Sequence, residues 1–360
     1  MNNENFKSND VIQLGKKKVG VGHEPFIIAE MSGNHNQSLN RAEEIVKAAA
    51  KAGAHALKLQ TYTADTMTID LNTDDFMVQE KDSLWAGKSL HQLYQEAHTP
   101  WEWHEPLFAL CKKLGMECFS TPFDATAVDF LEKLNVPFYK IASFENRDFA
   151  LIEKVADTGK PLIVSTGMAS FEEMQDIVNV IAKTGNNNFI LLKCTSTYPG
   201  DPSSSHVNTI PDMQKRLGCQ IGLSDHTLGI GVALASISLG ATVIEKHFTL
   251  SRAEGGVDAA FSLEPAELKQ LVVESQRAFK GLGQVHYGLV EGEKSSMRFR
   301  RSLYITKNCK AGDRLDDDNL RAIRPGFGLS PKYKDDVMGQ ELLIDVKCGT
   351  PLSWDMVNKK

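Results

Sequence analysis

The sequence predicts a (β/α)8 barrel followed by a small, mostly β domain, and three observations support this fold class. Between residues 26 and 285, short apolar runs alternate eight times with longer stretches of helical periodicity. The apolar runs are nearly continuous, as in parallel strands that are covered on both faces. No G-x-G-x-x-G motif follows the first strand, which disfavours the main alternative, an open doubly wound sheet. Eight parallel strands close naturally into a barrel.

The elements follow one another in a regular order. The expected strands are the segments 26–30, 55–60, 116–121, 137–143, 161–167, 189–196, 219–226 and 242–249. The helices expected after them are 38–53, 101–115, 125–135, 148–159, 171–185, 206–218, 229–240 and 264–283. A long irregular insertion, 62–100, follows the second strand, and insertions of that length inside a domain are usually functional.

Three further segments flank this repeat. Residues 1–25 contain a hairpin pattern, which we expect to cap the bottom of the barrel. Residues 286–296 lose both periodicities and predict a linker. Residues 297–360 consist of short strand patterns and turns, which predict a second, small β-rich domain.

The composition excludes several classes of protein. The net charge is −6 and no block of Lys and Arg occurs, so we expect no nucleic-acid partner. No apolar run is long enough to span a membrane, and the polar N-terminus lacks the core of a secretory signal. The six cysteines include no C-x-x-C pair, which is typical of reduced thiols. Together these features predict a cytoplasmic protein.

Every expected strand ends in polar or charged side chains, although each has an apolar body. Barrel enzymes carry their chemistry at these C-terminal strand ends. One such residue alone could be a hydrogen-bonded core serine or a lysine at the rim, but eight strand ends of this kind predict an active site. The residues concerned include Glu30, Lys58, Gln60, Thr121, Lys140, Ser143, Ser165, Ser224, His226, Glu245 and His247.

The residue types indicate two kinds of ligand. The lysines and hydroxyls suit an anion that carries phosphate and carboxylate groups; alternatively, the lysines pair with Glu30 or Glu245 in a charge network. His226 and His247 end neighbouring strands, so they suit a divalent transition metal, unless each is only a hydrogen-bonded core histidine. Strand alternation places Glu245 on the same face as His247 and places Lys246 on the opposite face.

A set of motifs in fixed order carries a family resemblance. The motifs are FIIAEMSGNHNQS, ALKLQTY, FSTPFD, YKIAS, IVSTGM, KCTSTYP, GLSDHT and IEKHFT. They resemble the sialic acid synthase family, whose members condense phosphoenolpyruvate with an amino-sugar aldehyde to give a nine-carbon 2-keto acid. The segment from 297 through LRAIRPGFG resembles the C-terminal antifreeze-like (SAF) domain of that family.

Within the family, five stretches look closest to pseudaminic acid synthases: LQTYTADTMT, KIASFE, CTSTYPG, GGVDAAFSLEP and IRPGFG. This resemblance implies a 2,4-diacetamido-2,4,6-trideoxy-L-altrose acceptor. Ser196 stands where sialic acid synthases proper typically carry Asn, which argues against N-acetylmannosamine as the acceptor. N-acetylneuraminate and legionaminate synthases, which use other amino-hexoses, remain the alternatives.

The resemblance also implies residue roles, a metal and an assembly. It assigns phosphoenolpyruvate to Lys58, Thr121, Lys140, Ser143, Ser165 and Ser224. The metal would be Mn²⁺, with Mg²⁺ or Co²⁺ as substitutes, on His226 and His247. The sugar would meet Gln60, Tyr198, Asp258 and Arg324, and the catalytic groups would be Glu30, His247 and Glu145. Arg324 would reach from one subunit into the barrel of another, which makes a domain-swapped homodimer.

Some assignments have alternatives. Tyr198 could be a packing residue of a Tyr–Pro turn, and Arg324 could be an exposed strand arginine. A metal-dependent aldolase that uses pyruvate is a second enzyme class compatible with these residues. A sugar-binding protein that has kept the barrel without turnover is a distant alternative.

Overall fold

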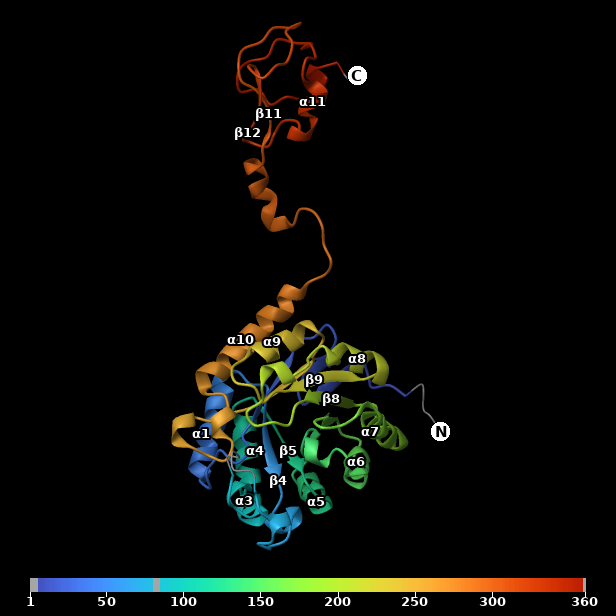
Figure 1. Ribbon diagram of the computed structural model, residues 1–360, viewed down its shortest axis with the longest axis vertical. Helices are drawn as coiled ribbons and strands as arrows, with labels where there is room; N and C mark the ends of the chain where they lie inside the picture. Colours follow the sequence, from blue (N-terminus) through green and yellow to red (C-terminus); the bar gives the residue numbers. More distant parts are fainter. Residues whose placement is uncertain (1–5, 80–84, 359–360) are drawn as a thin grey trace. The chain divides into compact units, whose positions relative to one another are not determined.

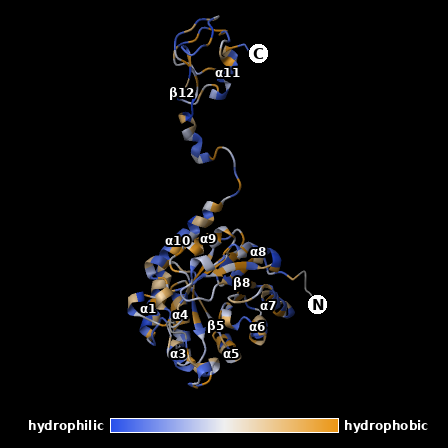
Figure 2. Ribbon diagram, viewed as in Figure 1, coloured by the Kyte–Doolittle hydropathy of each residue, from blue (hydrophilic) through white to orange (hydrophobic). Residues whose placement is uncertain are grey.

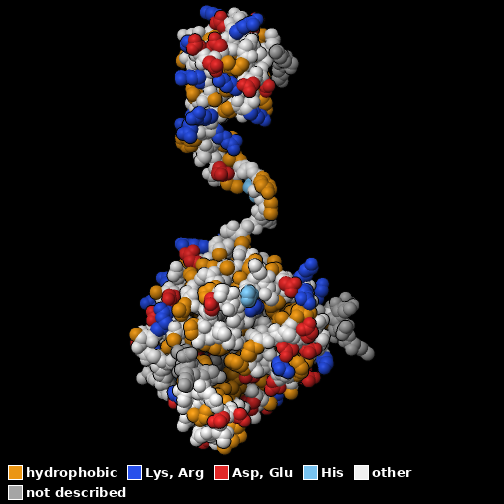
Figure 3. Space-filling model, viewed as in Figure 1, with side chains coloured by type: hydrophobic (Ala, Val, Ile, Leu, Met, Phe, Trp, Pro, Cys, Tyr) orange, Lys and Arg blue, Asp and Glu red, His pale blue; other side chains and the backbone are white. Residues whose placement is uncertain are grey.

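The computed structural model describes residues 6–79 and 85–358. The chain divides into two compact units, residues 1–283 and 284–360, and each is described by itself (Figure 1). None of the described helices combines the length and the apolar composition needed to cross a bilayer. On the face shown in Figure 3, charged side chains of both signs are interspersed with hydrophobic ones over the barrel unit.

The first unit contains a closed barrel of eight parallel strands, which confirms the predicted fold class (Figure 1). The strands are β3 (Phe26–Glu30), β4 (Ala56–Thr61), β5 (Glu117–Pro122), β6 (Tyr139–Ile141), β7 (Leu162–Ser165), β8 (Phe189–Cys194), β9 (Gln220–Ser224) and β10 (Val243–His247). Strand β10 pairs with β3 and closes the ring. Its register places His247 opposite Glu30, so the last strand ends beside the first.

One major helix follows each strand. These helices are α1 (Leu39–Ala52), α4 (His104–Lys113), α5 (Ala125–Lys133), α6 (Phe149–Ala156), α7 (Phe171–Thr184), α8 (Thr209–Leu217), α9 (Gly231–Ser238) and α10 (Pro265–Leu282). Helix α7 begins with a capping box in which the Ser170 hydroxyl accepts from Glu173 N. Hydrophobic and hydrophilic residues alternate along the helices in Figure 2, as expected for helices with one side on a sheet.

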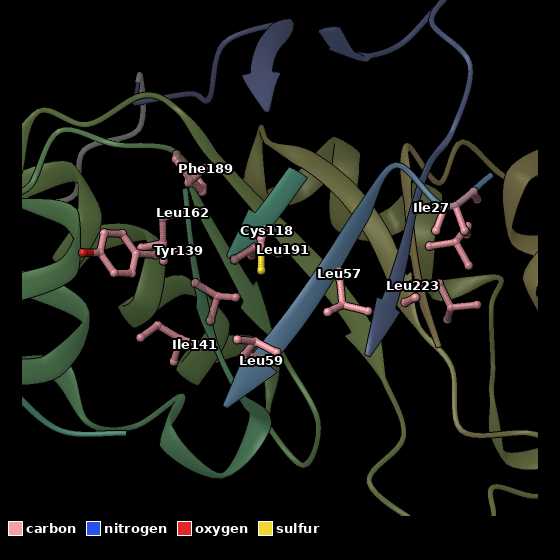
Figure 4. Packing of buried hydrophobic residues seen from close by; sticks show 14 of the residues in the cluster. Ile27, Leu57, Leu59, Cys118, Tyr139, Ile141, Leu162, Phe189, Leu191 and Leu223 are labelled. Atoms are coloured by element: carbon pink, nitrogen blue, oxygen red, sulfur yellow. The ribbon is translucent and has the colours of Figure 1, made fainter. Parts of the chain in front are cut away.

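Strand alternation separates two hydrophobic layers. The outer layer lies between the strands and the helices; Figure 4 shows members such as Ile27, Leu57 and Leu191. The inner layer fills one end of the barrel with residues such as Phe26, Phe119 and Phe138. Successive strand residues therefore belong to different layers.

An N-terminal hairpin closes that apolar end. Strands β1 (Val11–Leu14) and β2 (Lys17–Gly20) pair antiparallel. Ile12, Leu14 and Val19 are fully buried in the same cluster as the inner barrel residues. The interior is thus apolar at the hairpin end, and its polar residues lie toward the C-terminal ends of the strands.

The insertion after β4 contains short helices rather than only irregular chain. They are α2 (Ala64–Met67), the 3₁₀ segment Asp74–Phe76, α3 (Leu90–Ala97) and the 3₁₀ segment Trp101–Trp103. The end of α3 is fixed to the loop after β3, because the Gln37 amide donates to the carbonyls of Glu96 and His98.

The second unit has a small core of its own. Strands β11 (Ser302–Ile305) and β12 (Leu320–Ile323) pair antiparallel, and α11 (Lys334–Val337) follows. Leu303, Ile305 and Leu352 are fully buried in its hydrophobic cluster. The 3₁₀ segment Glu291–Phe299 begins within the stretch expected to be a linker, 286–296, and continues into the range predicted for the second domain.

Candidate active site

A cavity of about 490 Å³ lies at the C-terminal ends of the barrel strands. Small-molecule sites commonly have volumes of about 300–1,000 Å³. A larger hollow of about 690 Å³ lies beside α8 and α9, but its lining contains none of the residues that the sequence analysis selected. The lining of the strand-end cavity includes Lys58, Gln60, Lys140, Ser143, Glu145, Ser165, Tyr198, Ser224, His226, Glu245, His247 and Asp258.

Three of the selected residues lie elsewhere. Glu30 and Thr121 are fully buried one layer behind the cavity surface. Glu30 contacts two lining residues, Lys58 and Gln60, and Thr121 is paired in register with Gln60. Arg324 lies in the second unit, directly after β12, where it is exposed.

Four ionisable side chains form one buried network inside the barrel. Lys58 Nζ lies 3.0 Å from Glu30 Oε2 and 3.0 Å from Glu245 Oε1. Lys140 Nζ lies 3.4 Å from the same oxygen of Glu245. The lysines therefore pair with Glu30 and Glu245, as in the charge network that the sequence offered as an alternative to anion binding. Its two positive and two negative groups reduce the cost of burying each charge.

Burial shifts the protonation of two members of this network toward neutral pH. Burial raises the pKa of Glu30 to about 7, although Lys58 opposes the shift. Burial also lowers the pKa of Lys140 to about 8, although Glu245 opposes it. For Lys58, burial alone would lower the pKa, but Glu245 and Glu30 raise it above its ordinary value. Glu30 and Lys140 are therefore the members able to exchange protons near neutral pH.

The two imidazoles lie side by side at the cavity surface. The ring centres of His226 and His247 are 5.3 Å apart. His226 Nδ1 lies 3.0 Å from the carbonyl oxygen of Thr195, which can only accept, so this nitrogen carries a proton. Burial alone would lower the pKa of His226, but its contact with the Cys194 side chain raises that pKa above its ordinary value. His247 Nδ1 is buried and has no hydrogen-bond partner within the described part of the chain. Burial, with His226 nearby, lowers the pKa of His247 and keeps its ring neutral.

An imidazole binds a divalent transition metal through a nitrogen that carries no proton, so the neutral ring of His247 fits such a ligand. A metal bound at His226 would have to displace the proton that the raised pKa of this ring favours. Among residues 6–79 and 85–358, no group of three or more His, Cys, Asp or Glu side chains is arranged to hold a metal. His226 and His247 would therefore be the ligands that the protein provides, and water and substrate would supply the rest.

A polar shell fixes the residues around the imidazoles. Asp258 Oδ2 lies 3.6 Å from His247 Nδ1 and accepts a hydrogen bond from Ser32 Oγ. The Gln60 amide donates to Glu30 Oε1 at 3.0 Å and to Ser32 Oγ at 3.2 Å. Gln60 and Asp258 are thus joined through Ser32, a cavity residue that the sequence analysis missed because it lies in a loop without periodicity.

The hydroxyl groups in and behind the cavity differ in their hydrogen-bond partners. Thr121 Oγ1 and Ser165 Oγ are buried without a hydrogen-bond partner among the described residues. Ser143 Oγ accepts from the amide of Gly167 at 3.1 Å, which leaves its own proton free to donate. Ser224 Oγ donates to Glu245 Oε1 at 3.3 Å. Unpaired buried hydroxyls are costly, so their presence indicates that a ligand completes the site.

One aromatic residue, Tyr198, and one acidic residue, Glu145, also line the cavity. The Tyr198 ring packs 4.4 Å from His226 and 5.2 Å from Phe261, so it packs against the rings and lines the cavity at the same time. Burial raises the pKa of Glu145 to about 7. One of its oxygens, Oε2, has no hydrogen-bond partner in the described chain.

Besides Ser32, the lining contains Cys194 and residues of the insertion that had not been selected from the sequence, including the aromatic side chains of Tyr62, Trp85 and Tyr94. Cys194 ends β8 on the inward face, which the alternation with Ile190 and Leu192 indicates. An aliphatic wall from the insertion also lines the cavity, and strand patterns could not identify it. We call these residues the insertion wall: Met67, Val78, Leu90, Leu93 and Ala97.

A second buried ion pair lies on the outer side of the same strands. Lys246 Nζ donates to Asp225 Oδ2 at 2.8 Å and to the carbonyl of Thr227 at 2.7 Å. Asp225 Oδ1 accepts from both the amide and the hydroxyl of Thr227. Asp225 and Lys246 immediately precede His226 and His247, so the pair ties together the two strand ends that carry the imidazoles.

Comparisons of sequence and of structure relate this chain to the same group of proteins. A sequence model of the NeuB family matches residues 45–287, and a model of the SAF domain matches residues 300–358. The pseudaminic acid synthase of Helicobacter pylori is 40% identical over 93% of this chain and 98% of its own length. That of Campylobacter jejuni serotype O:2 is 39% identical over 91% of this chain and 95% of its own length. The crystal structure of the N-acetylneuraminic acid synthetase of Leptospira borgpetersenii, in complex with citrate, has a TM-score of 0.71 and 32% identity, covering 82% of this chain and 98% of that one.

Proposed function

Because the chain belongs to the NeuB family, we propose that it is a pseudaminic acid synthase. It condenses phosphoenolpyruvate with 2,4-diacetamido-2,4,6-trideoxy-L-altrose and water, and releases phosphate and a nine-carbon 2-keto sugar acid. The observation that carries this proposal is a single cavity that joins a cationic, hydroxyl-rich floor to an adjacent pair of imidazoles. The enzyme is thus a C–C bond-forming transferase.

The floor binds the anionic substrate in this proposal. Lys140 and Lys58 provide the positive charge, and Ser143 and Ser165 provide hydroxyl donors. Ser224 would have to turn its hydroxyl from Glu245 to the substrate to donate as well. Thr121 lies behind them and donates its unpaired hydroxyl if the substrate or a water reaches it. The paired glutamates prevent the lysines from forming an uncompensated positive cluster when the site is empty.

The sugar lies on the other side of the cavity, near Gln60, Tyr198 and Asp258. His226 and His247 would hold the divalent metal, which we propose to be Mn²⁺, with Mg²⁺ or Co²⁺ able to replace it. A bound cation would polarise the aldehyde oxygen of the sugar. Asp258 accepts from Ser32 and lies beside His247, so it orients that ring.

The reaction forms one C–C bond and breaks one C–O bond. C3 of phosphoenolpyruvate attacks the aldehyde carbon, and the aldehyde oxygen takes up a proton. Water adds to the cationic C2 and loses a proton, which leaves a hydroxyl group on that carbon. The bond between C2 and the phosphate oxygen then breaks, and the proton of this hydroxyl passes to the departing phosphate as the 2-keto group forms. Glu30, with its pKa near 7 and its fixed contacts to Lys58 and Gln60, is our candidate to position or deprotonate the water. Glu145 is the second candidate, since burial also raises its pKa to about 7.

The deciding experiment is a phosphate-release assay with a panel of acceptors. Purified protein is given phosphoenolpyruvate or pyruvate together with 2-acetamido and 2,4-diacetamido hexoses. We expect phosphate release with phosphoenolpyruvate, and most rapidly with the 2,4-diacetamido-6-deoxy altrose. Product from pyruvate would favour the aldolase, and faster turnover of another amino-hexose would favour an N-acetylneuraminate or legionaminate synthase. Binding without turnover would favour the non-catalytic reading.

We further propose a domain-swapped homodimer in which Arg324 of one copy contacts the sugar in the barrel of another. The support is the family relationship and the exposure of Arg324 together with Phe327, which is 70% exposed. Arg324→Ala should raise KM for the sugar about tenfold or more and leave KM for phosphoenolpyruvate unchanged. Mixing Arg324→Ala with Lys140→Met should restore activity if the residues act across subunits. Unchanged sugar kinetics would remove this proposal.

We also propose that the protein works in the cytoplasm. The six cysteines are free thiols in the structure, and phosphoenolpyruvate is an intracellular metabolite.

A further inference from the structure

The insertion wall is built from one face of a helix that faces the cavity. Leu90, Leu93 and Ala97 are spaced by three and four residues along α3, so they project from one side of it. Met67 at the end of α2 and Val78 extend this surface. Leu93 and Ala97 are each only 8% exposed, so they form the buried part of the wall, whereas Met67, Val78 and Leu90 are half-buried.

Several independent contacts hold the wall in place. The ring of Tyr62, at the start of the insertion, packs 5.8 Å from the ring of Tyr94 on α3. Val78 exchanges backbone hydrogen bonds with residues 87 and 88, which lead into α3. Trp85 Nε1 donates to the carbonyl of Val257 at 3.0 Å, next to Asp258. The wall is therefore fixed relative to the loop that carries Asp258.

The wall and the floor of the cavity differ in chemistry. The floor presents lysines, carboxylates and hydroxyls, whereas the five wall side chains end in aliphatic carbons or, in Met67, a thioether. A sugar hydroxyl buried against such a surface loses its hydrogen bonds to water without replacement. A methyl group in the same place gains from removal of its surface from water.

We infer that the insertion wall is a specificity subsite for the methyl groups of the acceptor sugar, namely the C6 methyl and the methyl of the 4-acetamido group. This inference rests on the proposed function and deepens it. It predicts selection of a 2,4-diacetamido-6-deoxy hexose over a 2-acetamido hexose with free hydroxyls at C4 and C6. An aliphatic pocket discriminates by about 10–200-fold per methylene-sized group, so we expect a preference on the order of 100-fold in kcat/KM.

The test compares Leu93→Asn with a matched control. Leu93 lies in the wall, whereas Ile69 belongs to the same insertion, is 55% exposed and does not line the cavity, so Ile69→Asn is the control. Leu93→Asn should lower kcat/KM for the diacetamido-6-deoxy sugar about 10–100-fold and narrow its preference over the 2-acetamido-6-hydroxy sugar at least tenfold. KM for phosphoenolpyruvate should stay within about twofold, because the floor is unchanged. An unchanged preference ratio would overturn the inference.

A second variant guards against loss of folding. Val78→Thr is nearly isosteric at a half-buried position, and it should narrow the same preference ratio severalfold. If Val78→Thr and Leu93→Asn are both folded and both keep the wild-type ratio, the inference is wrong.

A binding measurement separates this inference from the proposed function. The reduced, unreactive alditol of the diacetamido-6-deoxy sugar is added to the phosphoenolpyruvate-loaded enzyme and examined by saturation-transfer NMR. The C6 and acetyl methyl protons should receive the strongest transfer in the wild type, and Leu93→Asn should weaken it at least twofold. If these methyl contacts appear but the natural sugar is not turned over, the proposed function fails and the subsite survives. If turnover occurs and the ring protons receive the strongest transfer, only the subsite fails.

Discussion

Glu245 and Lys246 are successive buried charged residues of strand β10. They face opposite sides of the strand and differ in whether their partners lie within the protein. Glu245 faces the inside of the barrel, where one of its oxygens binds Lys58 and Lys140 and the other has no hydrogen-bond partner among the described residues. Lys246 faces the helices, where Asp225 and the Thr227 carbonyl both accept from it. The inner group keeps capacity for a ligand, and the outer group has its partners within the protein. Burial of charge therefore serves chemistry on one face of the strand and attachment of neighbouring strands on the other.

The largest effect on turnover is expected from a change at His247, which lies on the inner face of β10. His247→Ala removes one of the two proposed metal ligands, so turnover should fall at least about 10³-fold, or about 4 kcal/mol of transition-state stabilisation. Phosphate release at increasing Mn²⁺, with Mn²⁺ binding followed by EPR, measures both losses. Phosphoenolpyruvate affinity should change less than about threefold.

His286→Ala provides the control for this change, because His286 is exposed and outside the barrel unit. A His247→Ala protein that remains active without added metal would show that the metal assignment is wrong.

The outer residue should act on stability instead. Lys246→Met leaves Asp225 buried beside a hydrophobic group, and breaking a buried pair in this way costs about 3–5 kcal/mol of unfolding free energy. Thermal unfolding of the full chain, followed by circular dichroism, should show a clearly lower Tm. The double variant Asp225→Leu, Lys246→Met should recover much of the loss, since no unpaired charge remains. A Lys246→Met variant as stable as the wild type would show that the buried pair on the outer face does not stabilise the fold.

A cavity residue offers an intermediate test through pH. Burial raises the pKa of Glu145 to about 7, against opposition from Lys140 and with a small contribution from Asp148. The folded state thus keeps a proton that the unfolded state has already lost. The corresponding stability is fully present below about pH 4.5 and is lost as the pH rises through about 7.

Replacing Glu145 by Gln removes this titration. Between pH 5 and pH 8 the wild type should therefore lose about 2–3 kcal/mol relative to Glu145→Gln, at about 1.36 kcal/mol per pKa unit. Urea unfolding at both pH values measures the difference. An equal gap between the two proteins at pH 5 and pH 8 would show that this carboxyl is not shifted.

The smallest effect is expected at the surface. Lys154 pairs with Asp129 at 2.7 Å, with the two side chains 37% and 63% exposed. Lys154→Met repeats the Lys246→Met change at a hydrated site, where such pairs contribute about 0.2–1 kcal/mol. The same thermal unfolding measurement should show almost no shift in Tm. A loss comparable to that of Lys246→Met would mean that lysine truncation, rather than burial of the pair, is responsible.

Sequence patterns predicted the barrel and the inward face of its strands for a physical reason. The period of two separates Glu245 from Lys246, and chain order alone places His226 beside His247 on adjacent strands. The partners of Lys58 could not be predicted in detail, because Glu245 is 187 residues away in sequence and the pairing depends on barrel closure. The insertion wall escaped prediction because its members come from two short helices and an irregular segment, which share no period.

The cavity divides its lining between parts of the chain of very different extent. Five strands from across the barrel, β4, β6, β7, β9 and β10, contribute charged or hydroxylated residues to the floor, whereas one segment after β4 contributes the aliphatic wall. A lineage could therefore exchange residues 62–100 and alter the sugar it accepts without disturbing the groups that form and break bonds. The closed barrel, with its apolar end covered by the hairpin, would stay the same in such an exchange. The change in structure would therefore be confined to the segment. The choice of acceptor sugar would thus depend on one exchangeable segment, whereas the condensation depends on residues of the barrel strands.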